Sequence, residues 1–304
     1  FRLVDKNSST AKKKAFEADE HRHSNVDQGD FEKIPGNNLG YWLPTKAVEA
    51  FEKYPSVDDI SKPKIGMRTS DNKRFLRQWS EVSLRKMDCE SSNSQEALNR
   101  GAKWFPYNKG GGYQKWYGNH VFVVNWENDG EEIKEWTRQK YPSLGENLGW
   151  KISNEADYFQ KGITWSDVST NDISCRVMPQ GFLFDTKGPC IFPDELEMSY
   201  LLGVMNSAPS AYLLYALNPT VSYKLGDVGS LPYILTTPSN ENRVEGLVDP
   251  SVGLTKQDWD SRETSWDFTQ HPLIQQNAPS LEAAYDAWKA QATDDFLQLH
   301  ANEE

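Results

Sequence analysis

The residues best suited to ligand chemistry lie in the segment KWFPYNKGGGYQKWYGN, residues 103–119. It combines three lysines with several aromatic side chains and four glycines, and it contains no acidic residue. Lysines neutralise phosphates, aromatic rings stack on bases or sugars, and glycines let backbone N–H groups approach a ligand closely. The glycines match neither a P-loop nor a dinucleotide fingerprint. The segment predicts a loop that binds nucleic acid or carbohydrate, with a mobile surface hairpin as the alternative.

A second basic segment, KIGMRTSDNKRFLR, spans residues 64–77. Arginine pairs bidentately with guanine and asparagine with adenine, whereas threonine and lysine suit phosphates. This composition indicates contacts with nucleic acid. The alternative is a basic helix that Ser70 or Asp71 caps and that buries three apolar side chains, namely Phe75, Leu76 and Trp79.

A third segment, GITWSDVSTNDISCR at residues 162–176, offers four polar candidates: Ser166, Ser169, Ser174 and Arg176. Patterns for catalysis are weak in the whole sequence. Ser230 lies in Gly-Ser-Leu-Pro, which is not a nucleophile elbow. His21 and His23 have no second pair of ligands at metal-binding spacing. The sequence therefore predicts neither an active site nor a metal site.

The charge of the chain is unevenly distributed. The net charge of −11 at pH 7 argues at first against a nucleic-acid binder. Residues 60–120, however, carry 12 basic and 5 acidic side chains, whereas residues 239–304 carry 4 basic and 13 acidic ones. One basic block thus lies within an acidic chain, and a solvated, unevenly charged surface is the alternative interpretation.

Several elements must position these segments. Residues 46–54 have helical spacing and end at Pro55, and residues 119–126 form a β-rich run before the turn at 128–130. Residues 181–184 and 190–192 flank Asp185-Thr186-Lys187-Gly188 and predict a β-hairpin. Residues 197–217 predict one or two helices interrupted at Pro209. After Ser280, apolar residues at positions 281, 285, 288, 292, 296 and 299 predict an amphipathic helix.

Length and composition limit the class of protein. The longest apolar run has seven residues, 211–217, which is far below the roughly 20 that span a bilayer, so we expect no membrane segment. Three cysteines form neither a disulfide framework nor a metal motif, and a cytoplasmic location is the simplest expectation. Because the chain begins at Phe1 rather than Met, we interpret it as part of a longer protein.

Longer motifs are more specific than these clusters. They are IPGNNLGYWLP (34–44), KIGMRTSDNKRFLRQWSEVS (64–83), the segment at 103–119 with VVNWENDG, YFQKGITWSDVS (158–169), SCRVMPQGFLFDTKG (174–188), LLGVMNSAPSAYLLYALNPTVSYKLGDVGSLPYIL (201–235) and KQDWDSRETSWDF followed by HPL (256–273). In this order they resemble the specificity half of the PglX family, the adenine-specific DNA methyltransferases of BREX phage-defence systems. They are similar, more loosely, to target recognition domains of fused restriction–methylation enzymes. The resemblance covers about residues 34–275, and one departure is Ser70, where the family usually has glycine.

The resemblance implies a division of labour. The family's catalytic Asn-Pro-Pro-Tyr motif and its glycine-rich S-adenosylmethionine loop do not occur in this sequence. The segment would therefore read double-stranded DNA without a cofactor of its own, while the rest of the full-length enzyme uses S-adenosylmethionine to methylate a flipped adenine. This fragment alone is expected to be inactive. Its acidic tail is the candidate contact for other defence-complex proteins.

The resemblance also implies the fold and the domains. We expect a mixed α/β recognition domain with a β-rich core and flanking helices, followed by a helical segment. Residues 1–61 would be a connector from an absent methyltransferase domain, residues 62–235 the DNA target-recognition domain, and residues 236–304 an acidic helical C-terminal segment.

The predicted DNA-binding residues come from all three clusters. They are Lys64, Arg68, Thr69, Asn72, Lys73, Arg74, Lys103, Asn108, Lys109, Gly110, Gly111, Tyr113, Lys115, Trp116, Tyr117, Thr164, Ser166 and Arg176. Arg68, Asn72, Arg74 and Asn108 are the better candidates for base edges. Two other classes stay open, a carbohydrate-binding module built on Trp and Tyr and a partner-docking module built on the acidic tail.

Overall fold

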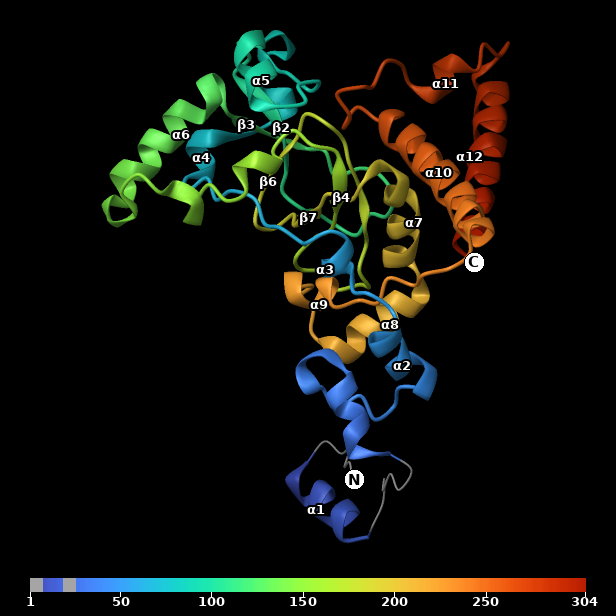
Figure 1. Ribbon diagram of the computed structural model, residues 1–304. Coiled ribbons are helices and arrows are strands. Elements are labelled where there is room, and N and C mark those ends of the chain that lie inside the picture. The colour runs from blue at the N-terminus through green and yellow to red at the C-terminus, as the bar shows by residue number, and fades with distance from the viewer. Residues whose placement is uncertain (1–7, 19–25) are drawn as a thin grey trace.

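The strands of the computed structural model form two small sheets, and helices surround them (Figure 1). The structure describes residues 8–18 and 26–304, so His21 and His23 lie outside the described residues. The first sheet has the order β1-β3-β2-β6 and the second has the order β5-β4-β7. The mixed α/β class predicted from the sequence is confirmed. The strands are β1 (Leu76–Gln78), β2 (Trp104–Asn108), β3 (Phe122–Asn125), β4 (Gly162–Thr164), β5 (Arg176–Met178), β6 (Leu183–Phe184) and β7 (Cys190–Ile191).

The pairing of β6 and β7 differs from the predicted hairpin. β6 pairs in parallel with β2, whereas β7 pairs antiparallel with β4 in the other sheet. An extended segment at residues 64–67 separates them: Lys64 exchanges backbone hydrogen bonds with Cys190, and the Met67 N–H donates to the Phe184 carbonyl. At Gly66 a Cβ would lie 1.7 Å from the Phe184 oxygen, so only glycine fits this approach. The hairpin prediction is wrong because residues 64–67 form backbone hydrogen bonds with both strands and lie between them.

Helices cover both sheets and continue beyond them toward both ends of the chain. Their bounds are α1 (Ser9–Glu17), α2 (Thr45–Lys53), α3 (Val57–Ile60), α4 (Asn72–Phe75), α5 (Ser94–Arg100), α6 (Glu127–Lys140), α7 (Glu195–Asn206), α8 (Ala208–Leu217), α9 (Leu225–Gly229), α10 (Pro238–Asp260), α11 (Pro272–Gln275) and α12 (Leu281–Glu303).

The helix predicted at 46–54 is confirmed as α2. The predicted pair at 197–217 is confirmed as α7 and α8, which break at Ser207, where the Ser207 Oγ accepts the Ser210 N–H. The turn at 128–130 is confirmed too, since Asn128 and Asp129 have positive φ angles. None of the helices in the described ranges is long and apolar enough to cross a membrane.

Two hydrophobic clusters hold the molecule together. One contains the four-stranded sheet, with Phe105 and Val124 paired across β2 and β3. The other lies between the three-stranded sheet and α7 and α8. This second cluster joins Val57, Leu231 and Val248, and Leu299 of α12 packs against it. Apolar packing therefore crosses both predicted domain boundaries, after residue 61 and after residue 235. The division of the chain into three domains stays a prediction.

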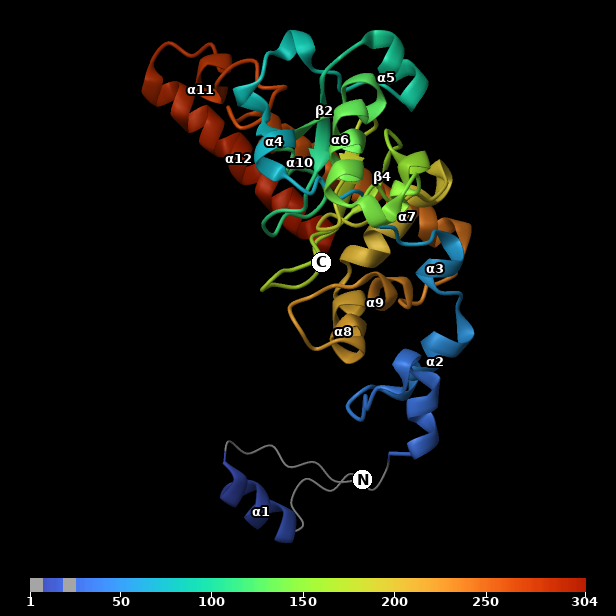
Figure 2. The same cartoon turned by 90° about the vertical axis from the view of Figure 1, so that its left-hand side faces the viewer.

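The C-terminal helices α10 and α12 lie side by side (Figures 1 and 2). The helix predicted after Ser280 is confirmed as α12, but its predicted amphipathic character is not. Ala284 is the one buried residue of α12, and two of the predicted apolar positions are largely exposed, Leu281 at 74% and Phe296 at 64%. The end of α12 returns to the body of the molecule, where the Trp116 Nε1 donates to Glu303 Oε1 at 2.6 Å.

An aromatic cluster around buried His120 attaches the C-terminal segment to the sheet region. The His120 ring stacks on Trp266 with centroids 5.9 Å apart and contacts Tyr117, Phe182 and Trp259. Burial, followed by the nearby charge of Arg176, lowers the pKa of His120 to about 3. The imidazole is therefore neutral in the folded protein at every pH near neutrality.

This histidine should make the fold sensitive to acid. The unfolded chain takes up a proton near the ordinary pKa of about 6.5, but the folded chain does so only near 3, so stability falls as pH drops between these values. We expect a loss of about 2 kcal/mol between about pH 7 and about pH 5, measured by urea denaturation. A His120→Phe variant should lose most of this slope. An unchanged slope in that variant would show that His120 is not the responsible group.

Candidate nucleic-acid interface

An open pocket of about 410 Å³ brings together three segments that are distant in sequence. Residues 68–73 form one wall and residues 185–187 form another, with the Lys109 side chain between them. Five of the predicted binding residues line this pocket: Arg68, Thr69, Asn72, Lys73 and Lys109. The pocket therefore brings together five of the eighteen predicted residues.

The wall at residues 68–73 is a tight turn that leads into α4. Thr69 is buried and its hydroxyl donates to Asn72 Oδ1, while Asp71 caps α4 by accepting the Arg74 N–H. Ser70 has a φ of +61°, in the left-handed region that glycine favours. The position where this chain departs from the PglX pattern is thus one whose backbone suits the usual glycine. The turn leaves the Arg68 and Lys73 side chains exposed at its two ends.

The cations at the pocket differ in how they are neutralised. Lys109 Nζ lies 2.8 Å from Asp185 Oδ2, and Lys187 Nζ lies 2.7 Å from Asp167 Oδ2. Within the described ranges, by contrast, the charged groups of Arg68 and Lys73 have neither a hydrogen-bond acceptor nor a carboxylate partner. The Arg68 guanidinium lies 5.8 Å from the Trp150 ring centroid. Arg68 and Lys73 are therefore the cations that can bind an anion without breaking an ion pair.

Basic and aromatic residues at 140–151 extend this surface, and the sequence reasoning missed them. Lys140 Nζ donates to the Ser70 carbonyl at 2.6 Å, and Lys151 Nζ lies 4.1 Å from the Tyr141 ring centroid. Hydrogen bonds from Ser70 and Lys151 lower the pKa of the Tyr141 hydroxyl. Trp150 is 66% exposed. The adjacent pairs Lys140-Tyr141 and Trp150-Lys151 were the available signal, but they lie outside the basic block.

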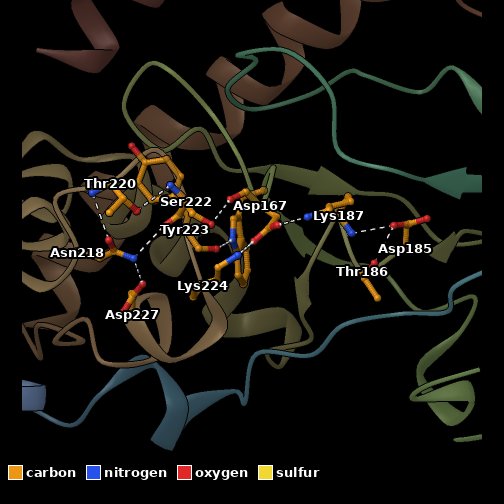
Figure 3. A network of polar contacts seen from close by, with 11 residues as sticks. Asp167, Asp185, Thr186, Lys187, Asn218, Thr220, Ser222, Tyr223, Lys224 and Asp227 are labelled. Carbon is orange, nitrogen blue, oxygen red and sulfur yellow. Dashed lines mark hydrogen bonds and ion pairs between the residues drawn. The ribbon is translucent and has the colours of Figure 1, made fainter. Parts of the chain in front are cut away.

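Asp167 links the pocket to a second exposed lysine (Figure 3). Its carboxylate accepts from Lys187 and, at 3.1 Å, from Lys224 Nζ. Burial opposes the ionised form, but these two hydrogen bonds prevail and the pKa of Asp167 is lowered. The two lysines are 60% and 58% exposed. Lys187 and Lys224 were not among the predicted binding residues, although the turn at 185–188 was recognised.

Four predicted cations lie elsewhere in ion pairs. Lys64 pairs with Asp157 at 2.7 Å, Lys103 with Glu127 at 2.9 Å and Lys115 with Glu303 at 3.3 Å. Arg74 pairs with Glu132 at 2.8 Å and stacks on Trp136 in a different pocket, lined by three glutamates. The structure does not bring these four side chains to the pocket.

Five further predicted residues are buried. Asn108 donates to Thr164 Oγ1 at 2.7 Å in the space between the sheets. Trp116 and Tyr117 are covered by the C-terminal segment, through Glu303 and through Lys256 above the Tyr117 ring. Arg176 has no exposed surface, and both of its Nη atoms lack a hydrogen-bond partner among the described residues. These positions support the fold around the pocket.

The glycine loop lies at the edge of the pocket. Ser166 is buried and its Oγ donates to the Gly111 carbonyl at 2.9 Å. Gly110 has a φ of +76°, and a Cβ there would lie 2.5 Å from the Lys187 carbonyl oxygen. The loop is thereby held against residues 185–188, and Tyr113 beyond it is 46% exposed.

Two curated proteins similar to this chain are adenine-specific methyltransferases. PglX of Lacticaseibacillus casei (strain Zhang) is 37% identical over 317 residues, which cover 100% of this chain and 26% of that protein. BrxX of Escherichia coli O9:H4 (strain HS) is 36% identical over 280 residues, which cover 90% of this chain and 21% of that protein. The resemblance to PglX is confirmed, and the chain spans about a quarter of the length of these relatives.

Two further comparisons concern protein-family models and solved structures. No protein-family model matches the chain. Among solved structures, the type IIL restriction-modification enzyme MmeI in complex with DNA is similar, with a TM-score of 0.47 and 9% identity. That match covers 83% of this chain and 33% of the MmeI chain.

Proposed function

We propose that this chain recognises double-stranded DNA for an adenine-specific methyltransferase. The observation that carries the proposal is the convergence of Arg68, Lys73, Lys109 and Lys187 on one open pocket in a chain whose net charge is −11. Cations gathered from three distant segments onto one face are the footprint that a phosphate backbone requires. The names of the two relatives support the methyltransferase part of the proposal.

The residues at the pocket would have different roles. Arg68 and Lys73 have no carboxylate partner among the residues that the structure describes, so they would be the principal contacts. Arg68 and Asn72 would also reach base edges. Lys109 and Lys187 keep their aspartate partners and would contribute less to DNA affinity. Trp150 and Tyr141 would pack against the sugar–phosphate backbone beside them. The buried residues named above would act by holding this surface in shape.

The chemical step would belong to the rest of the full-length enzyme. It would bind S-adenosylmethionine and transfer a methyl group to an adenine rotated out of the duplex. This chain would select the site at which that adenine is presented. The chain alone, supplied with S-adenosylmethionine and DNA, is expected to transfer no methyl group.

The test of DNA binding is its dependence on salt. With about four phosphate contacts, the affinity of the 304-residue chain for a fluorescent duplex should fall roughly 100-fold between about 50 and about 200 mM salt. Fluorescence anisotropy would measure it. Binding that is absent at low salt, or that does not change with salt, would contradict the proposal.

The observations argue against carbohydrate binding but favour partner docking as a second function. The carbohydrate alternative loses most of its predicted aromatic platform at residues 103–119, because Tyr107, Trp116 and Tyr117 are buried and Tyr113 is the exposed exception. For partner docking, a pocket of about 630 Å³ between α10 and α12 is lined by four aspartates beside Trp288 and Phe296. This acidic, partly apolar pocket favours contact with another defence-complex protein as a second function of the tail.

A further inference from the structure

Two loops beside the proposed DNA surface pair with each other. The Ser169 N–H donates to the Val221 carbonyl at 2.9 Å, and the Tyr223 N–H donates to the Asp167 carbonyl at 2.9 Å. Val168 and Ser222 form an antiparallel bridge between them. Residues 167–172 and 218–224, which we call the loop pair, therefore form a short two-stranded ribbon outside both sheets.

The ribbon is fixed at its base. Asp167 binds Lys187 and Lys224 (Figure 3). The Trp165 Nε1 donates to the Tyr223 carbonyl at 3.0 Å. Asn218 Nδ2 donates both to the Ser222 carbonyl and to Asp227, and the Tyr223 hydroxyl donates to the Asn171 carbonyl. A preorganised ribbon loses little conformational freedom when it binds, so it can serve as a rigid reading element.

The side chains presented by the ribbon are mostly uncharged. Val168 is 51% exposed and Val221 is 52% exposed. A pocket of about 520 Å³ beside them is lined by hydroxyl, amide and aromatic groups, with Asp172 as the charged exception: Ser169, Thr170, Asn171, Thr220, Tyr113, Tyr215 and Tyr223. The side chains of Thr170 and Asn171 are exposed and make no hydrogen bond within the described residues. This chemistry differs from that of the cationic pocket.

We propose that the loop pair enters the major groove of the DNA and reads base identity. The inference rests on the proposed function and deepens it. The major groove admits a two-stranded ribbon, amide and hydroxyl groups bond to base edges there, and small apolar groups contact the thymine methyl. Lys187 lines the cationic pocket and also binds Asp167 at the base of the ribbon. DNA held by its phosphates at the pocket therefore lies directly beside the loop pair, with Lys224 on the flank.

The test uses the full-length methyltransferase that contains this chain and a Thr170→Ala/Asn171→Ala double variant. Adenine methylation of genomic DNA is mapped by sequencing, and binding is measured on the wild-type recognition duplex and on duplexes with single base-pair changes. We expect discrimination at one or two positions to fall 10-fold or more, since each good base contact contributes about this much. Affinity for non-cognate duplex should stay within about twofold of wild type.

One control variant and two results that would contradict the inference complete the test. Asn240→Ala, on the exposed start of α10, should leave the recognised sequence unchanged. An unchanged sequence preference in the double variant overturns the inference, and so does an equal loss of affinity for cognate and non-cognate DNA. Neither result decides whether Arg68 and Lys73 contact DNA, because variants at those two residues test that proposed function separately.

Discussion

An Arg68→Glu/Lys73→Glu double variant should bind duplex DNA roughly 100-fold more weakly than the unaltered chain. Both side chains line the open pocket, and neither has a carboxylate partner in the described parts of the chain, so their charge is available to phosphates. A charge-assisted contact contributes on the order of 1.5 kcal/mol, and the loss of two gives about 3 kcal/mol. The slope of affinity against salt should also fall by about 2, since two phosphates are no longer neutralised. Fluorescence anisotropy over a range of salt concentrations would measure both effects.

Arg74 provides a control one residue away. It carries the same charge as Arg68, but it pairs with Glu132 and stacks on Trp136 in a different pocket. An Arg74→Ala variant should therefore keep its DNA affinity within about twofold. If that variant binds as weakly as the double variant, the effect is a general loss of positive charge, and the pocket is not the interface.

Replacing Arg176 by methionine should stabilise the protein. The guanidinium is completely buried, and both Nη atoms lack a partner within the described ranges. Burial lowers the pKa of Arg176 from 12.5 to about 10. This shift corresponds to a free-energy cost of roughly 3 kcal/mol for keeping the buried guanidinium protonated. Methionine fills similar space without a charge, and exchanging buried ions for apolar groups often stabilises by about 1–4 kcal/mol. We expect a gain of about 1–3 kcal/mol in urea denaturation.

Two further variants separate charge from packing. Arg176→Ala removes the same charge but leaves a cavity, so it should be less stable than Arg176→Met. Arg262→Met, at a side chain that is 63% exposed, should change stability by less than about 0.5 kcal/mol. A loss of stability in Arg176→Met would mean that the guanidinium has a partner in the folded protein. Because Arg176 is buried, its methionine variant should also bind DNA normally.

Sequence reasoning succeeded where the information was local. The helix at α2, the break near Pro209 and the turn at Asn128 follow from propensities and stop signals within a few residues. The turn at residues 68–73 is local as well, and four of the predicted binding residues in it line one pocket, but their role in DNA binding stays a prediction.

It failed where distant segments decide the outcome. β6 and β7 looked like a hairpin, but residues 64–67 pass between them. Trp116 was a candidate for DNA contact with a structural role as the alternative, and it is buried with its Nε1 donating to Glu303, 187 residues later. Lys187 reaches the pocket through a turn whose own sequence shows no binding pattern. Such contacts depend on tertiary packing, which a single sequence does not reveal.

The hydrophobic cluster that joins Val48 and Val57 to Leu201 and Leu299 has a consequence for biosynthesis. A ribosome adds about 5–20 residues per second, so the early members of this cluster wait on the order of 10–50 s for the last one. During that interval their apolar side chains lack their final partners and are open to chaperones and to aggregation. Contacts this far apart in sequence also slow folding after release. We therefore expect expression at low temperature or with chaperones to improve the yield of folded protein more than any change to the DNA-facing surface.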